Sequence, residues 1–198
     1  MRRPQFTFEH KKGFFIPNDS LFMIILSGIL FLFVFLEQKG YLYFGNWMTL
    51  FFAIWLLCFI VFMISRFFLY EIENGEYIGK LILKEESILI NDIEYKLEEI
   101  TSIKIYSSDI KGKRVNNTFE FTRHLSNGLD NEITLKLNNG ELVKTHFLQT
   151  DENKIKFSEK YLINYHLKKK YSLLHLLEIL EITDYDKIQI FKKNLKNY

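Results

Sequence analysis

Two long apolar runs dominate the first third of the chain, and short runs of alternating apolar and polar residues fill most of the remainder. The first apolar run extends from Ser20 to Leu36 and the second from Trp47 to Ile64, and neither contains a charged residue. Each is roughly 17 or 18 residues long, the lower end of what crosses the ~30 Å hydrocarbon core of a bilayer. Because lipid offers the backbone no hydrogen-bonding partners, each run must be a helix. We therefore predict a transmembrane helical hairpin over residues 20–70.

Two other interpretations of the apolar runs are a pair of buried core helices and a cleaved signal peptide. A soluble domain of this size rarely encloses two helices that are apolar all round. A signal peptide is disfavoured because the first run begins about 20 residues into the chain, has no small-residue cleavage site and is followed at once by a second run. The segment from Pro17 to Ser20 resembles a helix start.

The distribution of cations around the two runs predicts their orientation. Residues 1–19 form a basic tail and the second run ends at Arg66, whereas the connecting loop carries only Lys39, beside Glu37. Short loops rich in Lys and Arg stay in the cytoplasm, so both termini are expected there. The abundance of Lys, Asn, Ile and Phe is typical of an AT-rich bacterial genome, so we expect a multi-pass protein of the bacterial inner (cytoplasmic) membrane. The cations of the tail are Arg2, Arg3, Lys11 and Lys12.

From about residue 77 the pattern changes to seven short β-rich runs separated by turn residues. Asn-Gly between alternating runs is the strongest local hairpin signal, and it occurs in "ITLKLNNGELVKTHF". This stretch predicts a hairpin whose inward face is Ile133, Leu135, Leu137, Leu142 and Phe147. The seven runs are 77–84, 87–90, 93–97, 100–106, 118–124, 131–137 and 141–147.

Helical spacing returns after residue 150. A helix is expected to begin near Asp151 and to end at Lys168–Lys170, with Phe157, Tyr161, Leu162 and Tyr165 on one face. "SLLHLLEIL" predicts a second helix, and a third is expected to begin at Thr183-Asp184. The fold class is therefore an α+β membrane protein with a seven-stranded antiparallel half-open barrel and a capping helix (residues 71–170), followed by a helical extension (residues 171–198).

One stretch of the soluble half resembles the opening of bacterial pleckstrin-homology-like (PH-like) domains. It reads "GKLILKEESILINDIEYKLEEITSIKIYSSDIKGKR", and the positions that match the family pattern are Tyr95, Leu97, Ile100 and Ile103. In such proteins a membrane hairpin is often followed by short strands of this kind. The resemblance covers roughly residues 20–170 and leaves the last 28 as an addition. It implies a binding or scaffolding module and carries over no catalytic residue.

The remaining chemistry of the chain is sparse. No zinc-protease helix, paired cysteine, phosphate-binding glycine loop or nucleophile elbow occurs in the sequence. His124 and His146 lie on different predicted strands and can meet across a sheet, although ordinary solvent-facing histidines are the simpler interpretation. The single cysteine, Cys58, excludes an internal disulfide, and a net charge of +2 is too small to indicate nucleic acid. We expect no enzyme activity, no metal and no cofactor.

The basic stretch from Ser107 to Asn117 is the best candidate for a ligand site. Lys111, Lys113 and Arg114 are expected at a hairpin tip, and Arg123 on the next strand can point to the same end. Two interpretations stay open: a contact for an anionic ligand or lipid headgroup, and a solvated turn. Pleckstrin-homology domains that bind phosphoinositides use a basic hairpin between early strands. The loop here lacks their longer basic series, which favours the solvated turn.

Two functions follow as hypotheses. The first is a membrane-anchored interaction or scaffold module that docks a protein partner or forms a homo-oligomer through its amphipathic C-terminal helices. The second is a sensor of anionic lipid headgroups that uses the basic loop 109–114. The bilayer is a partner in both cases. The candidate docking residues of the first hypothesis are Leu173, Leu176, Leu177, Ile188, Phe191 and Leu195.

Overall fold

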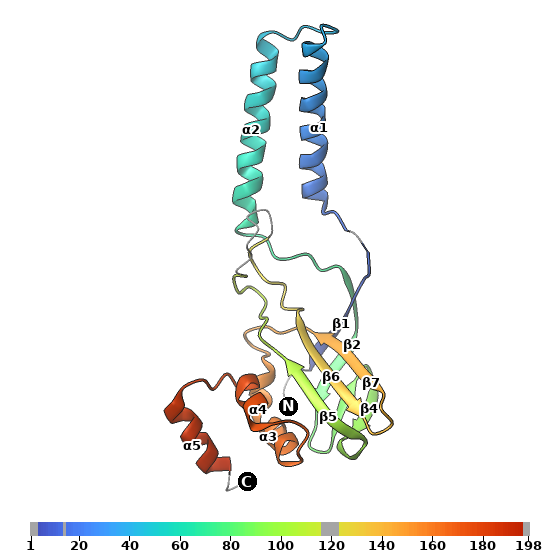
Figure 1. Cartoon of the computed structure of the whole chain (residues 1–198), viewed down its shortest axis with the longest axis vertical. Helices are drawn as coiled ribbons and strands as arrows, with labels where there is room; N and C mark the ends of the chain where they lie inside the picture. Colours follow the sequence, from blue (N-terminus) through green and yellow to red (C-terminus); the bar gives the residue numbers. More distant parts are fainter. Residues whose placement is uncertain (1–3, 14, 116–122, 196–198) are drawn as a thin grey trace. The chain divides into compact units, whose positions relative to one another are not determined.

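The structure, a computed structural model, describes residues 4–13, 15–115 and 123–195. It divides into two compact units, which are described separately (Figure 1). The sheet unit contains residues 1–11, 73–113 and 126–198, and the helical unit contains residues 12–72 and 114–125. Most of the predicted strand 118–124 lies outside the described residues.

The helical unit is built on two antiparallel helices, α1 (Asn18–Gln38) and α2 (Asn46–Arg66), which run side by side (Figure 1). Each has 21 residues, a length of about 32 Å. Their apolar side chains are almost all exposed, which is the reverse of what a core helix in water shows. Trp55 Nε1 donates a hydrogen bond to Ser27 Oγ at 3.0 Å across the pair. Both helices are long and apolar enough to span a membrane.

The sheet unit contains one seven-stranded antiparallel sheet, which confirms the predicted strand direction and six of the seven predicted strands. Its order is β4-β3-β2-β1-β7-β6-β5, so β4 and β5 are the two edges. The strands are β1 (Gln5–His10), β2 (Gly75–Leu83), β3 (Ser87–Ile90), β4 (Ile93–Lys96), β5 (Ile100–Tyr106), β6 (Asn131–Leu137) and β7 (Leu142–Phe147).

The strand β1 is the main difference from the sequence-based expectation, which placed residues 5–10 in a basic tail. The stretch "QFTFEH" pairs with β2 on one side and β7 on the other, so it lies at the centre of the sheet. Its alternating pattern is only six residues long and is flanked by cations, so the sequence analysis did not predict a strand there. The two long helices are consequently inserted between two paired strands, β1 and β2.

The helices of the sheet unit follow the last strand. A 3₁₀ turn, η2 (Ile155–Ser158), leads into α3 (Glu159–Leu167), and α4 (Leu173–Ile179) and α5 (Tyr185–Leu195) complete the chain. Tyr165 of α3 is buried, and its hydroxyl donates to the Lys84 and Ser87 carbonyls at 2.6 and 3.1 Å. Burial raises the pKa of this phenol. The core between sheet and helices includes Ile88, Ile100, Ile103, Ile133, Leu135, Phe147 and Leu162.

The register of the β6–β7 hairpin corrects one predicted core position. Ile133 pairs with Thr145 and Lys136 pairs with Leu142, and directly paired residues share a face of the sheet. Ile133, Leu135 and Phe147 are buried as expected, but Leu142 is 65% exposed. Side chains alternate along a strand, so residues 142 and 147 cannot both point inward. The prediction for Leu142 was therefore wrong.

The C-terminal segment covers one edge of the sheet and completes its core. The Ile103 N–H donates to the Lys170 carbonyl at 2.9 Å, and the Ile105 N–H donates to His175 Nε2 at 3.0 Å. These bonds satisfy backbone groups of the edge strand β5 that would otherwise invite pairing with another chain. Leu176 of α4 is fully buried in the same core.

This packing changes the status of the predicted docking residues. Leu176 and Leu177 are buried in their own domain, so they are not part of an accessible surface, contrary to the expectation for an amphipathic docking helix. Ile188 is half-buried. Leu173, Phe191 and Leu195 are partly buried against the core.

We predict that Leu176→Ala lowers the free energy of unfolding by roughly 2–5 kcal/mol, because it leaves a cavity in the core. Chemical denaturation of the full-length protein in detergent, followed by circular dichroism, measures the free energy of unfolding. Leu174→Ala is the matched control, since Leu174 is 68% exposed and its truncation should cost less than about 0.5 kcal/mol. Equal effects of the two substitutions would contradict the assignment of α4 to the core.

Candidate functional site

The predicted basic stretch lies in the long connection between β5 and β6, where two buried amides fix its backbone. Asn131 Nδ2 donates to the Asp109 carbonyl at 2.8 Å, and Asn131 Oδ1 accepts from the Asp109 N–H at 3.0 Å. Gln149 Nε2 donates to the Ser107 carbonyl and to Asn131 Oδ1, both at 2.8 Å. Both amides are almost completely buried, and such satisfied networks hold a backbone rigidly. The part of the stretch around Ser107 and Asp109 is therefore held against the sheet.

The four cations expected to converge are divided between the two units. Lys111 and Lys113 belong to the sheet unit, and Arg114 and Arg123 belong to the helical unit. Lys111 Nζ lies 3.3 Å from Glu73 Oε1, so an acidic neighbour already offsets its charge. Lys113 and Arg114 are exposed. Arg123 instead forms an ion pair with Asp19 at 3.2 Å.

A cluster of rings on the sheet is the second candidate site, and the sequence analysis missed it. We call it the outer-face aromatic cluster; its members are Phe6, Phe8, His10, Tyr77 and His146. The ring centroids of Phe6 and Tyr77 are 6.2 Å apart, those of Tyr77 and Phe8 5.2 Å, those of Phe8 and His10 5.0 Å, and those of His10 and His146 4.6 Å. All four contacts are edge-to-face, an arrangement that aromatic rings favour.

The strand register explains why these rings meet. Phe8 pairs with Tyr77 on β2 and with His146 on β7, so the three side chains share the face of the sheet opposite to the core. A register shift between Thr7 and Phe8 brings Tyr77 opposite Phe8. Gly75 leaves room for the Phe8 ring, because a Cβ there would lie 2.6 Å from two of its ring carbons. Phe8 is 1% exposed and supports the more exposed rings of Phe6 and Tyr77.

Burial and neighbouring charges shift the pKa values of two rings of the cluster, Tyr77 and His146, toward their neutral forms. Tyr77 Oη donates to Glu73 Oε2 at 3.2 Å, and partial burial together with the Glu73 charge raises the pKa of this phenol. Burial, followed by the positive charge of His10, lowers the pKa of His146. His146 Nδ1 is buried and has no hydrogen-bond partner among the described residues. The exposed rings of Phe6 and Tyr77 thus present an apolar, aromatic surface.

The histidines of the described ranges are not gathered into a metal site. Within the described ranges there is no group of three or more His, Cys, Asp or Glu side chains that can hold a metal ion. The pairing considered for His124 and His146 is not formed: His146 contacts His10, while the His124 ring stacks on Phe67 with centroids 4.5 Å apart. The signal that reveals the cluster is the Phe6, Phe8, His10 alternation in "QFTFEH".

Comparison of the chain with protein-family models, with curated proteins and with solved structures finds no match. The candidate sites therefore stand on the geometry alone.

We predict that acid weakens the fold through His146. Its pKa in the folded state is lowered below the usual value near 6.5, so the unfolded chain binds more protons between the two values. The stability that the neutral imidazole contributes is present above pH ~6.5 and is lost as the pH falls below it. The thermal midpoint of the full-length protein in detergent should fall between about pH 7.5 and about pH 5, and His146→Gln should reduce that fall. An identical fall in both proteins would refute the assignment.

Proposed function

We propose that the chain is a non-enzymatic, membrane-anchored interaction module. In this proposal α1 and α2 cross the bacterial inner membrane, both termini lie in the cytoplasm, and a PH-like sheet domain docks a protein partner on its outer-face aromatic cluster. The observation that carries the docking proposal is the exposure of two aromatic side chains on a rigid sheet: Phe6 is 48% exposed and Tyr77 is 46% exposed.

The membrane part of the proposal rests on the two helices and on the strands that flank them. The helices expose apolar side chains over nearly their whole surface, which lipid tolerates and water does not. Because β1 and β2 pair, the chain must enter and leave the hairpin on the same side of a membrane. The flanking cations Lys11, Lys12 and Arg66 favour the cytoplasmic side over the side of the loop that carries Lys39.

The PH-like part of the proposal is supported by the sheet and by the placement of the matching residues. Seven antiparallel strands followed by a packed helix are what the resemblance implies. Leu97, Ile100 and Ile103 of the family pattern are buried in the core, and Tyr95 packs against it. The burial of these four positions supports the proposed PH-like domain.

The docking part of the proposal rests on the chemistry of the cluster. Aromatic side chains on strands lose little conformational freedom on binding and bury a large apolar area, so they are enriched at protein interfaces. The occupant that fits is a partner protein segment with apolar side chains. Charged headgroups fit the cluster poorly, because the exposed rings of Phe6 and Tyr77 are apolar and Lys111 is paired with Glu73.

One observation supports the alternative function, which is sensing of anionic headgroups by the loop 109–114. Lys113 and Arg114 are exposed. Each such cation near an anionic surface contributes about 1 kcal/mol without specific geometry. This alternative predicts a salt-dependent attraction to membranes rather than a stoichiometric protein complex.

We predict that Phe6→Ala with Tyr77→Ala removes the partner that co-purifies with the tagged full-length protein in mild detergent. Loss of two aromatic anchors should weaken binding by more than about 2 kcal/mol, roughly 30-fold. Quantitative mass spectrometry of the purified complex measures the partner, and a differently tagged second copy reports self-association.

Tyr106→Ala is the matched control, because Tyr106 is 59% exposed at the end of the edge strand and lies outside the cluster. A partner retained in full by the Phe6/Tyr77 variant would contradict docking on the cluster. Loss of membrane association on the charge reversals Lys113→Glu and Arg114→Glu, with the partner retained, would favour the headgroup alternative.

A further inference from the structure

A buried group of charges lies at the end of the helical unit where α1 begins and α2 ends. Arg66 Nη1 lies 3.0 Å from Asp19 Oδ2, and Arg66 Nη2 donates to Ser20 Oγ at 2.8 Å. Arg123 Nη2 lies 3.2 Å from the same Asp19 oxygen, and Arg123 Nη1 donates to the Tyr70 carbonyl at 3.1 Å. We call Asp19, Arg66 and Arg123 the arginine cluster; all three belong to the helical unit.

The arginine cluster has an excess positive charge. Within the part of the chain that the structure describes, two guanidinium groups share the single carboxylate of Asp19. Arg66 is only 2% exposed, so water does not compensate for its charge. The Nε atoms of both arginines are buried and have no hydrogen-bond partner among these residues. A buried cation with an unused donor is costly unless an anion approaches it.

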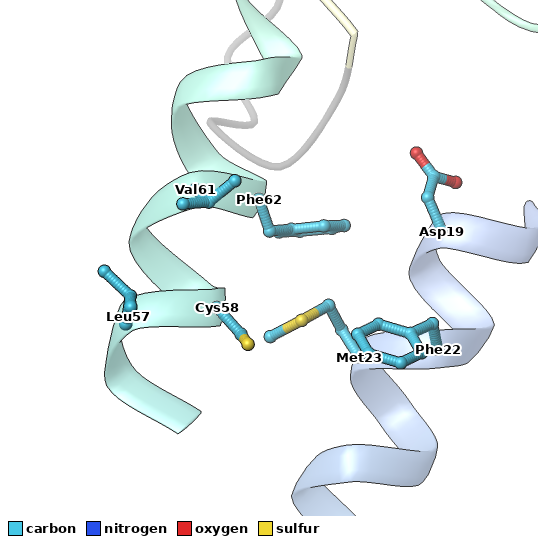
Figure 2. Close-up of a pocket in the computed structure, with 7 residues that line it drawn as sticks. All are labelled: Asp19, Phe22, Met23, Leu57, Cys58, Val61 and Phe62. Atoms are coloured by element: carbon cyan, nitrogen blue, oxygen red, sulfur yellow. The ribbon is translucent and has the colours of Figure 1, made fainter. Parts of the chain in front are cut away.

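An apolar groove adjoins the arginine cluster (Figure 2). It has a volume of about 370 Å³ and lies between α1 and α2, and Asp19 stands at one end of it. The Arg66 guanidinium lies 4.2 Å above the ring of Phe62, a residue of the groove wall. The groove therefore has an apolar body, and at one end it has the Asp19 carboxylate, which is paired with the two arginines. Its apolar lining residues are Phe22, Met23, Leu57, Cys58, Val61 and Phe62.

The position of the cluster along the helices matches the depth of lipid phosphates. Arg66 is the last residue of α2 and Asp19 is the second residue of α1, and each helix is about as long as the ~30 Å hydrocarbon core. In a spanning helix pair, these residues lie at the boundary between acyl chains and headgroups. The groove then lies among the acyl chains, and the arginine cluster lies level with the phosphate layer.

We propose that the arginine cluster and the adjoining groove bind one anionic phospholipid. Its phosphodiester accepts charge-assisted hydrogen bonds from Arg66 and Arg123, and one acyl chain fills the groove. This inference rests on the membrane spans of the proposed function and adds a lipid to them. An anionic lipid fits better than a zwitterionic one, because it alone neutralises the excess charge. The bound lipid ties residue 123, far along the chain, to the ends of both helices.

The test is lipid titration of the detergent-purified full-length protein, followed by native mass spectrometry. Dioleoyl phosphatidylglycerol should bind at least about tenfold more tightly than dioleoyl phosphatidylcholine, because the choline cation of the latter cancels the negative charge of its headgroup. Arg123→Gln should remove most of that preference. Lys39→Gln is the control: it removes an exposed cation of the same unit, in the loop at the other end of the two helices, and should leave the preference unchanged.

Two further variants separate the parts of the site. Cys58→Trp fills the groove without changing any charge and should weaken phosphatidylglycerol binding several-fold. Residues 116–122 contain a single acid, Glu120. If the Glu120→Gln variant prefers phosphatidylglycerol and the unsubstituted protein does not, Glu120 is the counter-ion of the arginine cluster. The proposal is then overturned. If inorganic phosphate competes fully at concentrations equal to those of the lipid, the ligand is a soluble anion and the lipid proposal is also overturned.

Alkaline carbonate extraction of membranes distinguishes this inference from the proposed function. A protein that stays in the membrane but shows no phosphatidylglycerol preference overturns the lipid site alone. A protein that carbonate extracts overturns the membrane spans, and the proposed function with them.

Discussion

The pairing of β1 with β2 is the contact on which the rest of the structure depends. The two strands are separated in the chain by both long helices, yet they pair from Gln5 with Leu81 to His10 with Gly75. Beyond the last pair the Lys11 N–H donates to the Asn74 carbonyl at 3.0 Å, and Lys11 Nζ lies 2.6 Å from Glu76. The entropic cost of closing a loop rises only slowly with its length, so a long insertion is compatible with a stable sheet. When the insertion is a membrane hairpin, this pairing holds the sheet beside the membrane at two points of the chain rather than one.

The same pairing builds the surface that we propose for docking. Phe8 meets Tyr77 and His146 only because β1 lies between β2 and β7. In the proposed function anchoring and docking therefore share one strand, so a change that displaces β1 should disturb both. The arginine cluster plays a similar role in the helical unit, since Asp19 and Arg66 tie the first turn of α1 to the last turn of α2. Each unit is held together by contacts between residues far apart in the sequence.

Local patterns in the sequence predicted the elements well and their partners poorly. The two apolar runs, the antiparallel strands after residue 75 and the C-terminal helices have strong periodicity, and the structure has them. β1 was missed because six residues carry a weak signal beside several cations. Leu142 was placed inward because the offset of a hairpin, not the composition of its strand, decides which residues face the core. The aromatic cluster and the pairing of Arg123 with Asp19 depend on contacts between distant segments, which periodicity does not encode.

The most direct test of this account is a cysteine crosslink between β1 and β2 in native membranes. Glu9 and Glu76 are exposed partners in the register, and Cys58→Ser removes the natural thiol. The account predicts that Glu9→Cys with Glu76→Cys forms a disulfide on mild oxidation, read as protection of both thiols from a mass-tagging reagent. Glu9→Cys with Glu98→Cys, on the distant 3₁₀ turn, should stay reactive. Free thiols in the first pair would contradict the central position of β1, and with it the insertion of the helices between two paired strands.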